Sequence, residues 1–227
     1  MSKLLALLPV VLATSAFATK LTETRKIADF TAIEVSDGVT LEVKKGATSL
    51  TIEGDDNVVP LYTTEVVSGV LKIRRKDRGI FRNRNEVVVR VSTATLKRIE
   101  ASGGVNATLD AVADRTFEAN LSGGVEFNAK RLDVDSLNLD ASGGVNVRAD
   151  GSAKMAKLHA SGGVGVKAKE LKIASVDLDA SGGCDLEVTA RESISGEISG
   201  GVGVKVYGNP PKSRVKASGG ADVDYLD

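Results

Sequence analysis

The chain of 227 residues contains one cysteine, one histidine, four prolines and no tryptophan. A single cysteine cannot form a disulfide within the chain, so the fold must depend on burial and backbone hydrogen bonds. Aromatic residues make up only 4% of the chain, which leaves valine, leucine, isoleucine and alanine to fill a core. Basic and acidic residues balance at 30 each, and a chain without net charge has no overall attraction to nucleic acid. We therefore expect no specific nucleic-acid partner.

Long apolar runs are also scarce, and the clearest one lies at the N-terminus. Residues 4–13 are almost wholly apolar, Lys3 precedes them, and Ala16-Phe17-Ala18 fits the small-x-small rule for signal-peptide cleavage. We expect a signal peptide over residues 1–18 and a single mature domain over residues 19–227. The run is too short to span a bilayer stably, so we expect no transmembrane segment in the mature chain. The predicted location is the periplasm, the cell surface or the extracellular space.

Glycine, in contrast, is abundant, and much of it recurs in the motif Ser-Gly-Gly at steps of 18 to 20 residues. Periods of about 20 residues are typical of proteins built from stacked turns. Around each motif apolar and polar residues alternate, and a period of two indicates strands with one buried face. We therefore predict an all-β fold, a single-stranded parallel β-helix or β-solenoid of ~20-residue coils, with Ser-Gly-Gly at a corner. The serines of the seven motifs are Ser102, Ser122, Ser142, Ser161, Ser181, Ser199 and Ser218.

An insertion interrupts this repeat near its start. Ser36-Asp37-Gly38-Val39 stands where Ser-Gly-Gly-Val stands later, yet the next corner does not come until Ser102. The insertion, about residues 44–98, contains the strand-like segments SLTIEG, GVLKIRR and EVVVRV and a polar loop. Since stacked repeats need caps that shield the open end of their core, we predict that these strands and the long loop form an N-terminal cap.

The entry to the repeat carries a family resemblance. FTAIEVSDGVTLEV from Phe30, LTIEGDDNVVP from Leu50 and the Gly-Val-Asn at 104–106 and 144–146 resemble the family described as "putative auto-transporter adhesin, head GIN domain". The resemblance spans roughly Lys26 to Tyr225. It implies an exported bacterial β-helix-like protein with an adhesive or envelope role. No catalytic residues belong to that family pattern, so the resemblance implies a protein that is not an enzyme.

A basic stretch in the insertion is the most distinctive surface feature. Such a stretch could bind anionic envelope polymers, glycans or a second copy of the chain. The alternative is a solvated loop whose charges keep one end of the stack from joining others. The candidate binding residues are Arg74, Arg75, Lys76, Arg78, Arg82 and Arg84.

The single histidine raises a competing hypothesis of catalysis. If the turns stack as predicted, Asp140 and Asp179 flank His159 on a polar face, beside serines. Carboxylate, imidazole and hydroxyl groups are the components of hydrolase sites, so an extracytoplasmic hydrolase is the alternative function. A purely structural envelope protein is the third. Because any exposed polar column contains such residues, we predict a non-enzymatic binding module without catalytic residues.

Cofactor and metal motifs are weak. Residues 162–167 resemble a phosphate-binding loop, but that chemistry needs a helix after the glycines, and a strand is expected there. Calcium-binding β-rolls use a nine-residue repeat, about half the period found here. Cys184 takes the place of valine in an inward column, which indicates a small buried residue rather than a reactive thiol. We predict no cofactor and no metal site.

Overall fold

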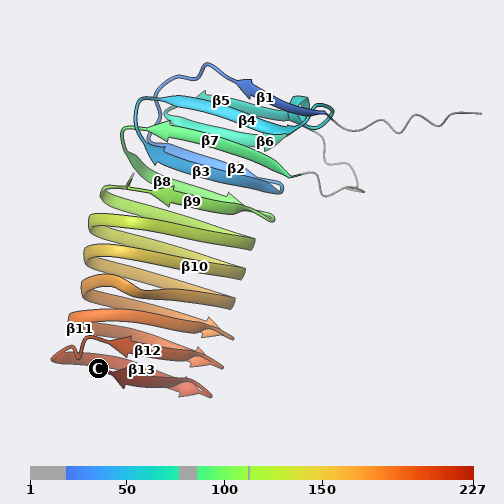
Figure 1. Ribbon diagram of the computed structural model, residues 1–227. Coiled ribbons are helices and arrows are strands. Elements are labelled where there is room, and N and C mark those ends of the chain that lie inside the picture. The colour runs from blue at the N-terminus through green and yellow to red at the C-terminus, as the bar shows by residue number, and fades with distance from the viewer. Residues whose placement is uncertain (1–18, 77–85, 112) are drawn as a thin grey trace, which may run out of the picture.

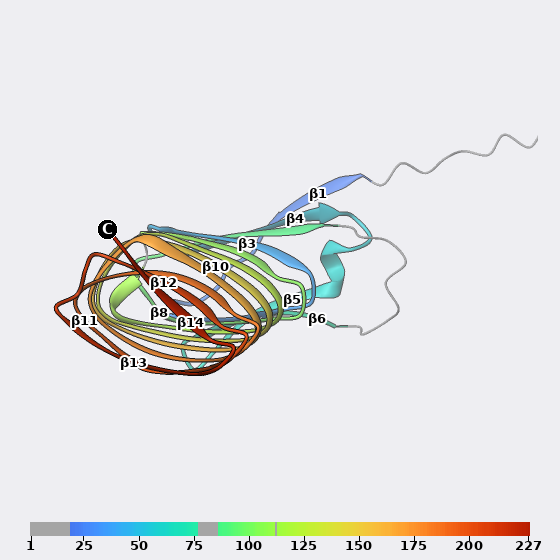
Figure 2. The same cartoon turned by 90° about the horizontal axis from the view of Figure 1, so that it is seen from below.

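The computed structural model of the protein describes residues 19–76, 86–111 and 113–227. Within these ranges the chain is almost entirely strand, and the one helical element is the short 3-10 turn η1 at Val59–Leu61. Figure 1 shows the strands as a tall stack of turns, and Figure 2, along the stack, shows their flattened outline around a common interior. The prediction of an all-β fold is confirmed. The predicted signal peptide, residues 1–18, lies outside the described residues.

Within the described residues, fourteen strands form one sheet. Their bounds are β1 Lys20–Thr24, β2 Ala32–Ser36, β3 Val39–Lys45, β4 Ser49–Asp55, β5 Tyr62–Val67, β6 Val70–Arg75, β7 Val87–Thr93, β8 Leu96–Ser102, β9 Asn106–Asp110, β10 Ala113–Gly182, β11 Asp185–Gly200, β12 Gly203–Tyr207, β13 Lys212–Gly219 and β14 Asp222–Leu226. The length of β10 reflects several successive turns that continue without a break in strand geometry (Figure 1).

Strands β8 to β14 pair in parallel, each segment beside the one that follows it about 20 residues later. Ser102 lies opposite Ser122, and Ser199 lies opposite both Ser181 and Ser218. The whole sheet is nevertheless mixed, because the pairs β1–β4, β4–β7 and β5–β6 are antiparallel. The prediction of a parallel β-solenoid is therefore not confirmed for the sheet as a whole, because the N-terminal strands include antiparallel pairs. Of these pairs, β5 and β6 are joined by a short hairpin, which antiparallel pairing allows and parallel pairing does not.

The second residue of each Ser-Gly-Gly needs glycine for two reasons. Gly182 has a φ of 95°, a conformation that residues with a Cβ rarely adopt. A Cβ at Gly182 would also lie 2.9 Å from the carbonyl oxygen of Gly162 in the preceding corner. Positive φ and close backbone approach therefore occur together, which explains why the corner keeps the same small residues in turn after turn.

The insertion contributes more than a cap. Strand β6 pairs in parallel with β2, and β7 pairs in parallel with β3, while β8 and β9 lie on the other sides of the same two strands. Leu71 and Ile73 of β6 are fully buried, as are Ile33 and Val35 of β2 beside them. The insertion thus adds β6 and β7 to the parallel stack, on the sides of β2 and β3 that face away from β8 and β9. Strands β4, β5 and β1 then cover this end of the stack through antiparallel pairs. Chain order and spatial order differ at this end.

The core runs along the interior and is aliphatic, with Phe117 as its largest fully buried side chain. Cys184 is 0% exposed, in agreement with its place in an inward column. An interior void lined by Phe117, Leu139 and Leu158 has a volume of only about 20 Å³. That is about the space of one water molecule, so this part of the core is closely packed.

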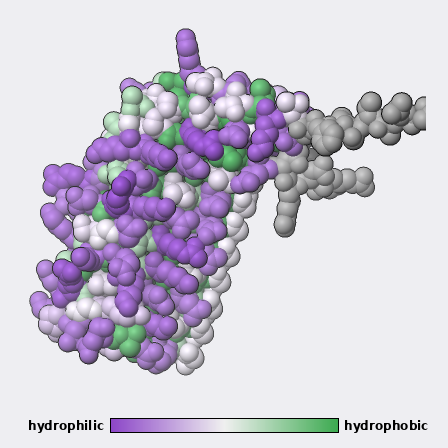
Figure 3. All heavy atoms as spheres, viewed as in Figure 1, coloured by the Kyte–Doolittle hydropathy of each residue, from purple (hydrophilic) through white to green (hydrophobic). Residues whose placement is uncertain are grey.

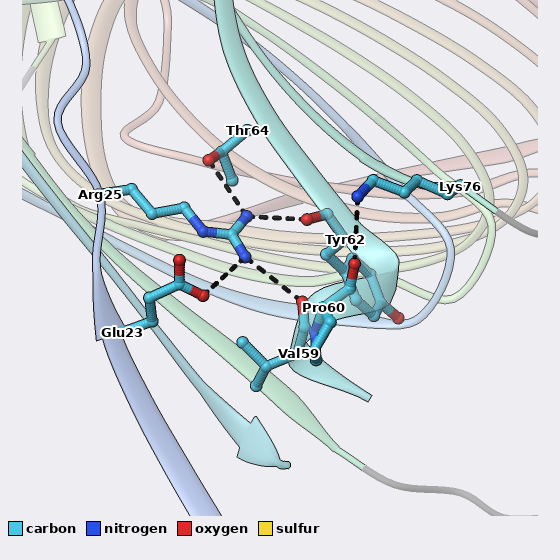
Figure 4. Close-up of polar contacts among 7 residues, drawn as sticks. All are labelled: Glu23, Arg25, Val59, Pro60, Tyr62, Thr64 and Lys76. Atoms are coloured by element: carbon cyan, nitrogen blue, oxygen red, sulfur yellow. Dashed lines mark hydrogen bonds and ion pairs between the residues drawn. The ribbon is translucent and has the colours of Figure 1, made fainter. Parts of the chain in front are cut away.

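Arg25, just after β1, holds the antiparallel strands together (Figure 4). Its guanidinium donates hydrogen bonds to the carbonyl oxygens of Tyr62 at 2.7 Å and Val59 at 3.3 Å, and to Thr64 Oγ1 at 3.3 Å. It also donates to the carboxylate of Glu23 at 3.0 Å, and this bond lowers the pKa of Glu23. One side chain thereby satisfies polar atoms of η1 and β5 that the fold takes out of water.

Candidate functional site: the ladder groove

A groove of about 1200 Å³ runs along one outer face of the stack, and we call it the ladder groove. Two columns of outward-pointing side chains line it, separated by one inward-pointing residue in each strand. The first column is Glu34, Glu100, Asn120, Asp140, His159, Asp179 and Glu197. The second is Ser36, Ser102, Ser122, Ser142, Ser161, Ser181 and Ser199.

Regular spacing is the main property of the ladder groove. Adjacent strands of a sheet lie ~4.8 Å apart, so its seven rungs extend over roughly 30 Å. Each rung offers a serine hydroxyl, which both donates and accepts hydrogen bonds, and most rungs also offer a carboxylate. The face of the stack seen in Figure 3 is largely hydrophilic. A periodic row of polar groups in a long hollow suits a ligand that is itself long and periodic.

Neighbouring cations partly neutralise the carboxylates of the groove. Glu100 lies 3.3 Å from Arg98, and Glu197 lies 2.9 Å from Lys216. The hydrogen bond from Lys216 lowers the pKa of Glu197, and the same contact raises the pKa of Lys216. No ion pair joins Asp140 to another residue in the part of the chain that the structure describes. Its carboxylate is therefore available to a ligand.

The structure brings the three residues of the hydrolase hypothesis into this one groove. His159 Nδ1 lies 3.4 Å from Asp179 Oδ2, and Asp140 lines the same groove. The side chains of His159 and Asp179 are 51% and 53% exposed, respectively. In Ser-His-Asp sites the aspartate is buried, which holds the imidazole in one orientation. The His159–Asp179 pair is instead about half exposed, so it lacks the burial that fixes the imidazole in such sites.

A polar cluster closes the N-terminal end of the groove. Arg74 forms an ion pair with Glu34, and Ser36 Oγ donates a hydrogen bond to Asp37 at 2.7 Å. Tyr62 donates its hydroxyl to the backbone oxygen of Asp37 at 2.8 Å. Burial raises the pKa of Tyr62, although the nearby Arg75 guanidinium opposes that shift. This end is therefore tied to the antiparallel strands.

The structure describes three of the six predicted binding residues, Arg74, Arg75 and Lys76. Arg74 and Arg75 line the ladder groove. Lys76 instead turns toward η1, where its ammonium donates to Pro60 O at 3.3 Å (Figure 4). Arg78, Arg82 and Arg84 lie outside the described residues. A single basic surface made by all six remains a prediction.

Sequence reasoning identified the columns of the groove but not the groove itself. The 20-residue period places Asp140, His159 and Asp179 in one column, yet the alternation alone does not distinguish a flat face from a hollow one. The sequence places Arg74 and Arg75 in the basic stretch of the insertion, apart from these columns. They reach the groove because β6 pairs with β2, a contact between segments that no local pattern connects.

Two features are absent from the described residues. Those residues contain no group of three or more histidine, cysteine or acidic side chains arranged to hold a metal ion. They also contain no helix that is long and apolar enough to cross a membrane.

The family pattern agrees with this geometry. The family model described as "Putative auto-transporter adhesin, head GIN domain" matches residues 29–210, which include both columns of the groove. The chain belongs to this family. The head GIN match covers β2 to β12, that is, the insertion and the parallel stack except for its last turn. Comparison with curated proteins gives no match.

Solved structures share the head GIN fold. A putative adhesin from Bacteroides fragilis has a TM-score of 0.87 at 21% identity, with 92% of this chain and 97% of that chain covered. A putative lipid binding protein from Parabacteroides distasonis has a TM-score of 0.69 at 18% identity, with coverages of 92% and 97%. A putative adhesin from the same organism has a TM-score of 0.69 at 17% identity, with coverages of 92% and 98%. At these identities the likeness concerns the fold alone.

Proposed function

We propose that this protein is an exported, non-enzymatic β-solenoid that acts as an adhesin-like binding module of the bacterial envelope. In this proposal residues 1–18 are the signal peptide, residues 19–227 form one domain, and the mature protein works in the periplasm or at the cell surface. Membership of a family of adhesin heads supports the adhesive role. The observation that carries the proposal is the ladder groove, in which hydroxyls and carboxylates repeat at the spacing of the strands.

The charge of the groove selects the class of ligand. Six carboxylates line it, against the two guanidinium groups of Arg74 and Arg75 and the imidazole of His159. Cations pair with Glu34, Glu100 and Glu197. A polyanion would therefore meet repulsion mainly at Asp37, Asp140 and Asp179, whereas a neutral or amino-bearing glycan would not. Sugar hydroxyls also match the serine column, since both partners can donate and accept hydrogen bonds. We therefore assign the groove to a linear neutral or amino-bearing glycan.

The basic residues have a separate role in this proposal. Arg74 and Arg75 stand at the N-terminal end of the groove, where they favour a carboxylate or other anion at one end of a bound chain. Arg78, Arg82 and Arg84 would add contacts to anionic envelope polymers. If neutralising Arg74 and Arg75 left binding unchanged, these two residues would not belong to the binding site. The site would then consist of the serine and acidic columns alone.

Lipid binding, which the name of one structural neighbour suggests for that protein, has less support here. The interior void of about 20 Å³ has no room for an acyl chain, and the groove is lined mainly by hydroxyls and charged groups. The hydrolase alternative rests on the contact of 3.4 Å between His159 and Asp179. If it were correct, His159→Ala would abolish cleavage of a glycan that the protein still binds.

A glycan array probed with residues 19–227 tests the proposal. We expect binding to neutral or amino-bearing linear glycans and its loss in the double variant Ser142→Leu with Ser161→Leu, because two leucines fill the middle of the groove. Asn106→Leu with Asn146→Leu is the matched control, since both asparagines are exposed on strands but do not line the groove. Equal binding by the two double variants would exclude the ladder groove as the site.

A further inference from the structure

The two strands of the last turn each have one unpaired edge. Among the described strands, β13 pairs only with β11, and β14 pairs only with β12. Figure 1 shows this turn at the bottom of the stack, at the end opposite the antiparallel strands. The backbone N–H of Asp222 bonds to Val202 O at 2.9 Å. Because backbone groups alternate in direction along a strand, the N–H and C=O groups of Val223 and Tyr225 face the unpaired edge.

The apolar interior is also exposed at this end. Tyr225 is 48% exposed, although Val206, directly above it in the sheet, is fully buried. Val215 and Val223 pack against the core but are only partly buried. Unpaired, partly apolar strand edges are the usual sites at which chains join by adding strands. This turn therefore has the properties of an interface.

Charge indicates which surface fits there. The outward side chains of β13 are basic, Lys212, Arg214 and Lys216, and those of β14 are acidic, Asp222 and Asp224. We propose that two copies of the chain associate through their last turns, with β13 of each copy antiparallel to β14 of the other. A two-fold axis along the length of the turn produces this pairing, and it forms both strand contacts at once.

The register follows from a contact within one chain. The hydroxyl groups of Ser213 and Tyr225 bond to each other across the turn, so these residues lie at the same height along its length. The two-fold axis then places Ser213 opposite the partner's Tyr225. In this antiparallel register, Arg214 lies opposite the partner's Asp224, and Lys216 lies opposite the partner's Asp222. Val215 meets the partner's Val223, and this contact would cover the exposed end of the core.

Other arrangements of two copies are less favourable. A two-fold axis perpendicular to the first would pair β13 with β13, which sets arginine and lysine opposite like charges, and directly opposed like charges destabilise a sheet. A head-to-tail chain would place this turn on the N-terminal end, where η1 and the antiparallel strands cover the core and bury Val59 and Tyr62. Only the antiparallel β13–β14 contact matches both charge and apolar surface.

Paired charge reversals test this interface. Sedimentation velocity of residues 19–227 should show a monomer–dimer equilibrium that weakens as salt is added, since salt screens exposed ion pairs. Arg214→Asp with Lys216→Asp should weaken the dimer at least about tenfold, because four attractive cross-strand pairs become repulsive. Asp222→Lys with Asp224→Lys should do the same. Mixing the two double variants should restore a dimer that contains one copy of each, since every opposed pair is then opposite in charge.

Two exposed lysines in the middle of the stack provide a control for sedimentation velocity. Lys157→Asp with Lys172→Asp makes the same change in charge at exposed positions in the middle of the stack and should leave the dimer intact. To test the register, a Lys216→Cys chain mixed with an Asp222→Cys chain should form a disulfide-linked pair. A wild-type monomer at all concentrations, open-ended oligomers, or double variants that do not recombine would overturn the proposal.

Discussion

The repeat and the N-terminal strands enclose the same kind of aliphatic core, but the contacts between their neighbouring strands differ. In the repeat, backbone lies directly on backbone: a Cβ at Gly196 would lie 1.8 Å from the carbonyl oxygen of Leu178. In the N-terminal region, a Cβ at Gly69 would have no atom within 4 Å, and side chains such as Arg25 make the connections between strands. Close contacts between successive backbones therefore recur in the repeat, whereas the N-terminal strands add particular side-chain contacts to their backbone pairing.

The largest effect should come from placing a side chain between two turns. Gly196→Ala should destabilise the protein by about 4 kcal/mol or more, because the backbone of the turn above cannot move away and φ is 143°. Gly69→Ala, at a φ of 77° in open space, should cost only about 1 kcal/mol. Denaturant unfolding of both variants measures the difference. Similar losses at the two sites would contradict the contrast between the regions.

Removal of Arg25 should give the next largest effect. Arg25→Ala removes the guanidinium that donates to the carbonyl oxygens of Tyr62 and Val59, although Val59 O still accepts from the backbone N–H of Tyr62, so the expected cost is about 2 kcal/mol. Arg25→Lys keeps the charge but supplies fewer donors in a different geometry, so it should recover only part of the loss. Hydrogen exchange of β5 should increase in Arg25→Ala while the repeat stays protected. Equal loosening of the repeat would show that the two regions do not act separately.

A substitution that follows the repeat pattern should have little effect. Cys184→Val restores the residue found at the same place in most other turns and conserves an apolar side chain, so the expected change is below about 1.5 kcal/mol. The thiol is only a weak hydrogen-bond donor, and it lies 3.3 Å from Ser181 O and 3.5 Å from Gly162 O. Thermal unfolding tests this expectation. A large loss would mean that Cys184 has a role beyond filling its column.

The smallest effect should come from an exposed ion-pair ladder across three turns. Lys154 and Arg115 lower the pKa of Asp135, so this carboxylate stabilises the fold above its ordinary pKa and loses that contribution as the pH falls through the lowered value. Asp135→Asn should therefore lower the Tm slightly at pH 7 and not at all in strong acid. Because the pair is solvent-exposed, high salt should reduce the difference as well. A Tm difference that persists in acid would point to a role in packing.

Much of the fold was predictable because its determinants are local and repeated. Alternation with a period of two around Ser122 or Ser142 indicates a strand, and the recurrence of Ser-Gly-Gly predicts that the same residues face each other in successive turns. The columns containing His159 and Cys184 follow from that spacing. The N-terminal region was less predictable, since Arg25 bonds to groups more than 30 residues away and no repeat connects them.

The amino-acid sequence by itself thus determined the strands, the inward columns and the glycine corners, since each depends on the alternation or conformational freedom of residues close in the chain. Only the tertiary structure decided three other features: the position of β6 and β7 beyond β2 and β3, the hollow shape of the face that bears the serine and carboxylate columns, and the unpaired edges of β13 and β14. Each of these depends on which distant strand occupies a given edge. Edge-to-edge backbone hydrogen bonds are nearly independent of side-chain identity, so local pattern does not specify that choice.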